Sequence, residues 1–426
     1  MNPPLDPRKL QSPAVRIVNA VATRWRKAIS LDPEHLMEKA RRTCHLTDFG
    51  GDDIREALRV LSHSMDRELP LHFTGRLLAR RDILRSLTTR LKVVEHLRAY
   101  PETEAVPLPD PVVITGLPRS GTTFLQRLLA QDPRTRTLRA WELHNPVPPP
   151  PGTPDTRFER SVRGRALFLR QFYSAAGRET RRAIHFAEAT DPEECGALLR
   201  NCLRTSAFPA RAAGPEYASW LEAQDLTETY RFYRKQLQIM TAAQPAERLL
   251  VKHPGHLHRL DEIFSVFPGA RIVWVHRDPI EAIPSVCSLT VLTLAERTNA
   301  ARTGHLGPIV VDVWVRSVAR GMEARARHSE DRFLDVYYRD LIGDPAGTAR
   351  RIYEFLGWPW EQGWEELLTN WLAQDREARR GISHRYSAEA FGLTADEIQR
   401  AFRSYTETFP RIAERSPAAA FAAASR

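Results

Sequence analysis

The 426-residue sequence has few cysteines and no long apolar run, and both absences narrow the possibilities. Its four cysteines form no C-x-x-C pair and have no zinc-ligand spacing with histidine, which argues against a disulfide framework and a zinc finger. No stretch approaches the roughly 20 apolar residues that a membrane-spanning helix requires. The first residues also lack the apolar core of a secretory signal. We therefore expect reduced thiols, no transmembrane segment and a cytoplasmic location.

Lysine is also scarce, although the chain is basic. Only six of the 62 basic residues are lysines, and the formal net charge is +10. The arginines are spread along the chain and do not form a basic stripe with aromatic residues between them, so we expect no nucleic-acid partner. The net charge favours an anionic ligand instead. Lys252 is notable because lysine is rare in this chain and this one lies at the end of an apolar run.

The apolar pattern predicts an α/β protein with a helical N-terminal part. Residues 1–108 show helix signals only, among them a cap at Asp32 followed by Pro33, and predict an all-helical extension. From residue 109 to residue 426, short apolar runs alternate with helices, as in a parallel sheet flanked by helices. Within this domain, residues 155–245 predict a helical insertion. The predicted strands are 112–115, 249–252, 270–276 and 333–338.

A glycine-rich turn follows the first predicted strand. GLPRSGTT, residues 116–123, has the G-x-x-x-x-G spacing of a phosphate-binding loop, and a helix is predicted to begin near Thr122. Backbone N–H groups and the helix dipole at such a turn bind a tetrahedral anion. Thr122 stands where a nucleotide triphosphatase has its lysine, and Arg119 lies three residues earlier. No carboxylate is placed to hold Mg²⁺ at the loop, so we expect no metal in the site.

A second basic residue follows another predicted strand. In VWVHRDPIEAIPSVCSL, Arg277 ends the strand and Asp278-Pro279 predicts the start of a helix. Ser285 follows Arg277 by eight residues, nearly two turns along that helix. Arg277 and Ser285 can therefore converge on one phosphate.

Three motifs occur in order: the glycine-rich loop, the strand-end lysine in K-x-P, and R-D-P with its following serine. With this combination the chain resembles the sulfotransferases that use 3′-phosphoadenosine-5′-phosphosulfate (PAPS). The resemblance covers roughly residues 110–360 and is closest to bacterial members with PRSGTT and to the tyrosylprotein and glycan branches. It implies a P-loop-type sheet, with the 5′-phosphosulfate at the loop and the 3′-phosphate at Arg277 and Ser285. The implied donor-binding residues are Arg119, Ser120, Gly121, Thr122, Thr123, Arg277, Ser285 and Tyr338.

The resemblance also implies catalytic residues. Arg119 and Lys252 would stabilise the bridging oxygen of the leaving phosphate. The tyrosylprotein branch takes its general base from a glutamate after the loop helix, which matches Glu142 here, although two extra residues precede it. The cytosolic branch uses a histidine two residues after its lysine, where this chain has Pro254. Four histidines remain rivals for the role of base: His144, His185, His253 and His256.

The predicted function is transfer of a sulfuryl group from PAPS to a hydroxyl, phenolic or amino acceptor, with release of 3′,5′-ADP. The helical insertion would lie near this acceptor, which could be a small molecule, a lipid or a glycan. A P-loop kinase that uses ATP–Mg²⁺ is the alternative, and the missing lysine disfavours it. A nucleic-acid-binding protein with a vestigial loop is weaker still. The sequence leaves the acceptor and the oligomeric state open.

Overall fold

A five-stranded parallel sheet forms the centre of the molecule. The computed structural model describes residues 6–184, 188–209, 214–245, 247–300, 303–378 and 387–412. The strand order is β2-β3-β1-β4-β5, and every neighbouring pair is parallel. The strands are β1 (Pro111–Gly116), β2 (Thr135–Thr137), β3 (Arg248–Lys252), β4 (Arg271–His276) and β5 (Phe333–Tyr337). The α/β class and the four strands expected from the sequence are confirmed.

Strand β2 was not predicted. Its three residues, Thr135–Thr137, have no apolar run, and the strand lies at the edge of the sheet. It is held there by parallel pairing with the start of β3, with Thr135 opposite Arg248 and Thr137 opposite Leu250. Pairing with a distant strand is a tertiary effect that a local pattern does not show.

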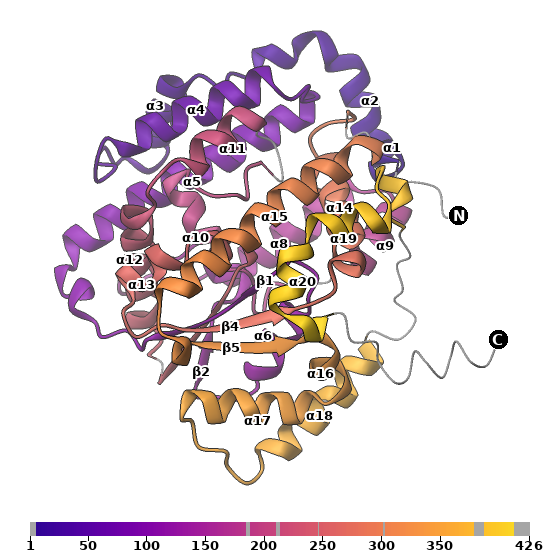
Figure 1. Cartoon of the computed structure of the whole chain (residues 1–426). Coiled ribbons are helices and arrows are strands. Elements are labelled where there is room, and N and C mark those ends of the chain that lie inside the picture. Colours follow the sequence, from indigo (N-terminus) through magenta and orange to yellow (C-terminus); the bar gives the residue numbers. More distant parts are fainter. Residues whose placement is uncertain are drawn as a thin grey trace.

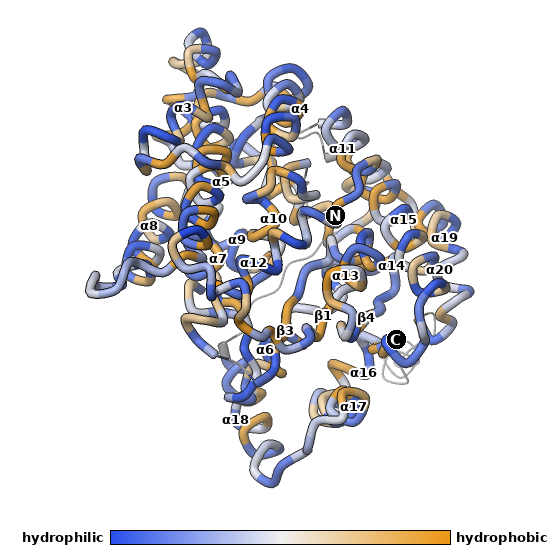
Figure 2. The backbone as a smooth tube through the Cα atoms, turned by 90° about the vertical axis from the view of Figure 1, so that its left-hand side faces the viewer, coloured by the Kyte–Doolittle hydropathy of each residue, from blue (hydrophilic) through white to orange (hydrophobic). Residues whose placement is uncertain are grey.

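Two groups of helices cover the two faces of the sheet (Figure 1). On one face, Val112 and Ile114 of β1 pack in a cluster with residues of α6 (Thr122–Leu129), α17 (Pro345–Leu356) and α18 (Trp364–Ala378). On the other face, Val113 joins a larger cluster formed with many helices. This alternation is the two-residue period of a strand buried on both sides. Figure 2 shows β1 and β3 as strongly hydrophobic segments at the middle of the molecule.

The described N-terminal part is helical, as predicted. Asp32 caps its helix by accepting a hydrogen bond from the backbone N–H of His35. Leu36, Ile54 and Ile83 belong to the same hydrophobic cluster as Val113 of the sheet. The predicted boundary between residues 108 and 109 stays a prediction. The elements are α1 (Pro7–Leu10), α2 (Pro13–Val21), the 3₁₀ segment η1 (Ala22–Ala28), α3 (Pro33–Cys44), α4 (Asp53–Arg67), α5 (Phe73–Ala99) and η2 (Pro101–Ala105).

The remaining helices follow the sheet strands or form the segment between β2 and β3. The described parts of residues 155–245 are helical or irregular and contain no named strand. They comprise α8 (Arg157–Phe172), α9 (Ala175–Ile184), α10 (Gly196–Leu199), η3 (Arg200–Cys202), α11 (Pro215–Glu222) and α12 (Thr227–Ala243). The others are α7 (Ala140–Leu143), η4 (Pro254–His258), α13 (Leu260–Val266), α14 (Pro279–Ala295), α15 (Thr303–Arg327), η5 (Glu330–Arg332), α16 (Tyr338–Gly343), η6 (Glu389–Phe391), α19 (Ala395–Ala401), α20 (Arg403–Thr408) and η7 (Pro410–Ile412). None of the described helices is both long and apolar enough to cross a bilayer.

The end of β1 depends on a residue without a side chain. Gly116 has a φ of 138°, and a Cβ built on it would lie 2.2 Å from the carbonyl oxygen of Val275 in β4. Gly116→Ala should therefore push β1 and β4 apart and lower the free energy of unfolding by about 1–3 kcal/mol or more. Urea denaturation measures this loss. Gly164→Ala is the matched control, because a Cβ at that position would have no other atom within 4 Å. Equal stability of the two variants would contradict the close approach.

Candidate active site

The carboxyl ends of three neighbouring strands bring the predicted residues together. β1 lies between β3 and β4, with Ile114 opposite Lys252 and Gly116 opposite Val275. The loop that follows β1 therefore emerges between the end of β3, which carries Lys252, and the end of β4, which leads into Arg277. Ligands of open parallel α/β sheets bind at this edge.

The loop has the backbone of an anion-binding turn. Arg119 and Gly121 both have positive φ, 69° and 93°, and α6 begins immediately after Gly121. Ser120 is fully buried, and its hydroxyl donates to the carbonyl of Leu117 at 2.7 Å. A Cβ on Gly121 would lie 3.0 Å from the ring of Tyr338, so the loop packs closely against this residue. When right-handed and left-handed backbone conformations alternate before a helix N-terminus, successive backbone N–H groups point toward one place.

Four of the predicted donor-binding residues meet beside this loop. Arg119 donates from Nε to the hydroxyl of Ser285 at 3.0 Å, and Arg277 donates from Nη1 to the carbonyl of Arg119 at 2.7 Å. The Arg277 guanidinium lies 4.2 Å from the ring centre of Tyr338. Arg277 and Ser285 therefore each contact Arg119. Arg277 also pairs with the carboxylate of Glu281 at 3.1 Å. Such a cluster suits a phosphate on a nucleotide. The convergence of Arg277 and Ser285 on one phosphate stays a prediction.

Lys252 is enclosed at the other side of the loop. It is 1% exposed, and its Nζ donates to Thr123 Oγ1 at 3.1 Å and to Glu194 Oε1 at 3.0 Å. The second oxygen of Glu194 lies 3.4 Å from Nδ1 of His253. Burial would raise the pKa of Glu194, but the charge of Lys252 and the contact with His253 hold this pKa well below its usual value. The resting site therefore contains an ionised carboxylate next to the predicted catalytic lysine.

Glu194 was missed by the sequence reasoning. It lies in the short segment DPEEC, which has no periodicity and no spacing that links it to the loop. The next residue, Cys195, donates its backbone N–H to the carbonyl of Lys252 at 3.0 Å, and this bond fixes the segment beside β3. Glu194 joins the site through its contact with Lys252, which lies 58 residues further along the chain.

Glu142, the predicted base, occupies a different environment. Its carboxylate accepts two hydrogen bonds from Arg136, at 2.6 and 3.0 Å, and a third from the backbone N–H of Arg139 at 2.9 Å. The side chain is buried and closes the start of α7. These are the contacts of a structural ion pair, and the role of Glu142 as base stays a prediction.

The histidines that were rivals for the role of base lie in different environments. His256 is buried, with Tyr230 Oη 2.8 Å from its Nδ1 and Cys195 Sγ 3.1 Å from its Nε2. Burial lowers the pKa of His256 well below its usual value, so the ring is neutral and held on both sides. His253 contacts Glu194, and His144 follows α7. His185 lies outside the described residues.

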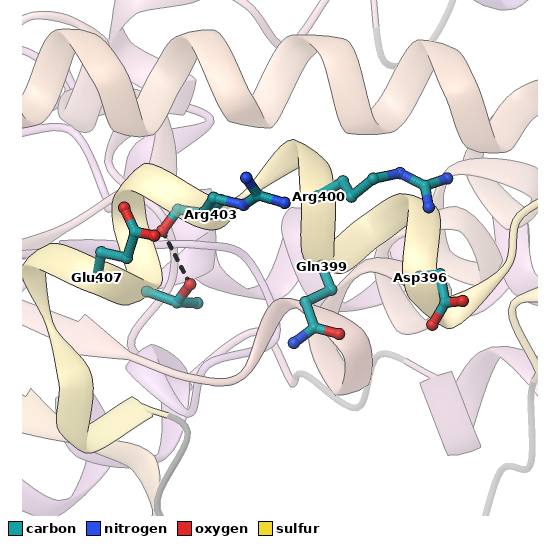
Figure 3. A pocket seen from close by; sticks show the side chains of 6 residues that line it. Asp396, Gln399, Arg400, Arg403 and Glu407 are labelled. Carbon is teal, nitrogen blue, oxygen red and sulfur yellow. Dashed lines mark hydrogen bonds between the residues drawn. The ribbon is translucent and has the colours of Figure 1, made fainter.

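Other candidate sites are weaker. Within the described ranges, no group of three or more His, Cys, Asp or Glu residues is arranged to hold a metal ion. A surface hollow on α19 and α20 contains none of the residues predicted to bind the donor, and its polar side chains lie along the outside of these helices (Figure 3). Its lining residues are Asp396, Gln399, Arg400, Arg403, Thr406 and Glu407.

The fold is P-loop-like, and the cluster lies at the sheet edge where such folds bind their ligands. A model of the sulfotransferase family matches residues 111–362, which is more than half of the chain and includes β1, the loop, Lys252 and Arg277. The chain belongs to the sulfotransferase family.

Solved structures and curated relatives agree with this assignment. The sulfotransferase STF1 of Mycobacterium tuberculosis is 32% identical with a TM-score of 0.71, over 87% of this chain and 98% of that one. The sulfotransferase STF9 of Mycobacterium avium is 27% identical with a TM-score of 0.79, over 88% and 96%. An omega-hydroxy-beta-dihydromenaquinone-9 sulfotransferase of Mycobacterium bovis is 27% identical over 60% of this chain, and the match spans 64% of that relative's length. A protein-tyrosine sulfotransferase of Danio rerio is 24% identical, over 60% of this chain and 56% of its own.

Proposed function

We propose that this protein transfers the sulfuryl group of PAPS to an acceptor hydroxyl and releases 3′,5′-ADP. The observation that supports the proposal is that two groups of cationic and hydroxyl side chains lie at one sheet edge. The first is the loop with Arg119, Thr123 and Lys252, and the second is Arg277 with Ser285, which both contact Arg119. Two such groups match a donor that carries a 5′-phosphosulfate and a 3′-phosphate, whereas ATP has no 3′-phosphate.

The residues present fit the donor. The loop backbone and the N-terminus of α6 would hold the 5′-phosphosulfate, with Ser120, Thr122 and Thr123 in the same turn. Arg277 and Ser285 would hold the 3′-phosphate, because a guanidinium and a hydroxyl both donate to phosphate oxygens. The face of Tyr338, beside Arg277, is suited to the adenine or its ribose. When bound, PAPS supplies an activated sulfuryl group and an adenosine phosphate as the leaving group.

The kinase alternative fits less well. A P-loop kinase needs a lysine in the loop for the β- and γ-phosphates and a hydroxyl and a carboxylate for Mg²⁺. Here Thr122 takes the place of that lysine, and Asp278 uses its side chain to accept from the backbone N–H of Ile280 at the start of α14.

Lys252 and Glu194 form the reactive pair of the proposed mechanism. Lys252 Nζ stabilises the negative charge that develops on the bridging oxygen of the leaving phosphate. Arg119 adds a second cation at the loop. As Lys252 is drawn toward this charge, Glu194 Oε1 loses its cationic partner, and the affinity of its carboxylate for a proton rises. Glu194 then accepts the proton of the acceptor hydroxyl at that oxygen.

We infer that Glu194, rather than Glu142, is the general base. Both oxygens of Glu142 are taken by Arg136, whereas Glu194 has a side chain that is 38% exposed, so an acceptor can reach it. The Glu194 carboxylate also shares Lys252 with the loop hydroxyl of Thr123. A base that contacts the catalytic cation would lie close to the sulfuryl group in transfer, where the acceptor hydroxyl must also bind.

The acceptor is proposed at the level of its reacting group. The curated relatives include a sulfotransferase named for a hydroxylated menaquinone and others named for protein tyrosine, so the shared chemistry is a hydroxyl group. A cytoplasmic location is supported by the cysteines Cys44, Cys195, Cys202 and Cys287, which are all free thiols. The helices between residues 155 and 245 are proposed to border the acceptor, because Glu194 belongs to that segment.

The first test concerns the 3′-phosphate. Arg277→Ala should weaken binding of 3′,5′-ADP by about 1.5–3 kcal/mol, because a charged hydrogen-bond donor to the phosphate is lost. Binding of 5′-AMP should hardly change. Isothermal titration calorimetry with both ligands measures this, and Arg55→Ala, an exposed arginine that pairs with Glu34, is the control. An equal loss of affinity for both nucleotides would remove Arg277 from the 3′-phosphate site.

The second test concerns metal. Turnover of labelled PAPS with an acceptor found by screening should persist after complete chelation of divalent ions, because the site neutralises the leaving group with Lys252 and Arg119. Rates are compared with and without EDTA, and again after addition of Mg²⁺. Activity that is abolished by EDTA and restored by Mg²⁺ would favour the kinase-like alternative.

The third test separates the two glutamates. Glu194→Gln should lower kcat by roughly 10²–10⁴-fold, because it removes a base but keeps the size of the side chain. The affinity for 3′,5′-ADP should persist. Glu142→Gln should keep most of kcat but lower the free energy of unfolding by up to about 5 kcal/mol, because buried Arg136 loses its anionic partner. Steady-state kinetics and urea denaturation are measured on both variants. If kcat collapsed in a stably folded Glu142→Gln and turnover stayed near normal in Glu194→Gln, Glu142 would be the general base.

A further inference from the structure

Helix α2 exposes an apolar face to solvent. Ile17 and Val21 are 64% and 63% exposed, Val18 is 42% exposed, and Trp25 in the following segment η1 is 49% exposed. At 100° per residue, Ile17, Val18 and Val21 fall within an arc of about 100°. We call these four residues the N-terminal apolar surface. Leu77 of α5 and Leu167 of α8, the helices that contact α2, are also exposed large apolar residues.

The orientation of α2 differs from that of an ordinary surface helix. Its uncharged polar residue Asn19 is buried and accepts from the backbone N–H of Thr74 through Oδ1 at 2.9 Å. Val15 packs against the cluster that contains Leu10 and Phe172. A surface helix normally buries its apolar face. α2 instead directs a polar residue inward and a continuous apolar stripe outward, at the periphery of the molecule (Figure 1).

The charges in the segment that carries this surface are all of one sign. Between Ser12 and Ser30 the chain contains four basic residues and no Asp or Glu. The basic residues Arg16, Arg24, Arg26 and Lys27 are all exposed. The Arg24 guanidinium lies 4.1 Å from the ring centre of Trp25, so a cation and an amphipathic aromatic ring are in contact on this surface. Tryptophan with basic neighbours is typical of segments at the boundary between lipid and water.

This pattern distinguishes among possible occupants. A second copy of the chain would bring two sets of the same four cations into one interface, which is unfavourable. An anionic lipid bilayer offers an apolar layer for the four side chains and negative headgroups for the cations around them. We propose that the N-terminal apolar surface docks on an anionic lipid bilayer, with α2 lying in the plane of the interface.

The docking surface is linked to the active site through packed helices. α14 begins next to Arg277 and ends in the cluster where Leu292 and Ala295 meet Leu10 of α1. α1 directly precedes α2. A helix of this length spans about 25 Å, so the donor site is connected to the docking surface by roughly one helix length. Docking itself does not depend on sulfuryl transfer and is tested without activity.

The experiment measures binding of the full chain to vesicles. Cosedimentation is compared between vesicles with about 30% anionic phosphatidylglycerol and vesicles of phosphatidylcholine alone. The wild type should bind the anionic vesicles, and binding should weaken at about 0.5 M salt, where charges are screened. Ile17→Asp/Val21→Asp should lower binding roughly tenfold or more, because two charges then face the acyl chains. Ile309→Asp is the matched control, since Ile309 on α15 is 61% exposed but lies outside this surface, and its binding should be unchanged.

A second variant tests the proposal even if the first variant misfolds. Arg24→Glu/Lys27→Glu leaves the apolar residues intact and should also abolish the preference for anionic vesicles, while circular dichroism verifies the fold of each variant. Wild-type binding to neither vesicle, or equal binding of the wild type and both double variants, would overturn the proposal. It would also be overturned if light scattering showed a wild-type dimer that Ile17→Asp/Val21→Asp converts to a monomer without any change in vesicle binding.

Discussion

The contact between Gly116 and the carbonyl of Val275 determines how the site is assembled. Because Gly116 has no Cβ, β1 can end against β4 and turn sharply into its loop. The loop then emerges between Lys252 at the end of β3 and Arg277 after β4. A side chain at this position would separate the strand ends, and with them the two groups that are proposed to bind the two phosphorylated ends of the donor. The chemistry of the site thus depends on a close approach of two backbones.

The ion pairs of Glu142 and Glu194 are similar in composition but differ in how far they enclose the carboxylate. Arg136 holds both oxygens of Glu142 and a backbone N–H adds a third bond, so this carboxylate is satisfied and enclosed. Lys252 reaches only one oxygen of Glu194 and is shared with Thr123, and the glutamate side chain remains partly exposed. The pKa of Glu194 is held low by Lys252 and His253 against the effect of burial. In the proposed mechanism the cation of the second pair is drawn away and its carboxylate accepts a proton, whereas the contacts of the first pair are those of a structural ion pair.

Local chemistry explains what could be predicted from the sequence. Asp32 caps a helix at the predicted position, and α6 begins at Thr122 because the loop ends in glycine. The apolar runs of β1, β3, β4 and β5 are long enough to indicate buried strands. β2 and Glu194 were not found, because each acquires its role from a partner distant in sequence. The same limit applies to Glu142: the resemblance to the tyrosylprotein branch suggested a base, but only the fold reveals its pairing with Arg136.

The proposed function requires selective recognition of a nucleotide with a 3′-phosphate. The most direct measurement is the thermal unfolding temperature of the purified protein with 3′,5′-ADP, and separately with ATP–Mg²⁺, at equal concentrations. A ligand that binds only the folded state raises this temperature, and the rise grows with the ratio of ligand concentration to Kd. The account predicts a clear rise with 3′,5′-ADP and little change with ATP–Mg²⁺. A larger rise with ATP–Mg²⁺, or no rise with 3′,5′-ADP, would contradict it.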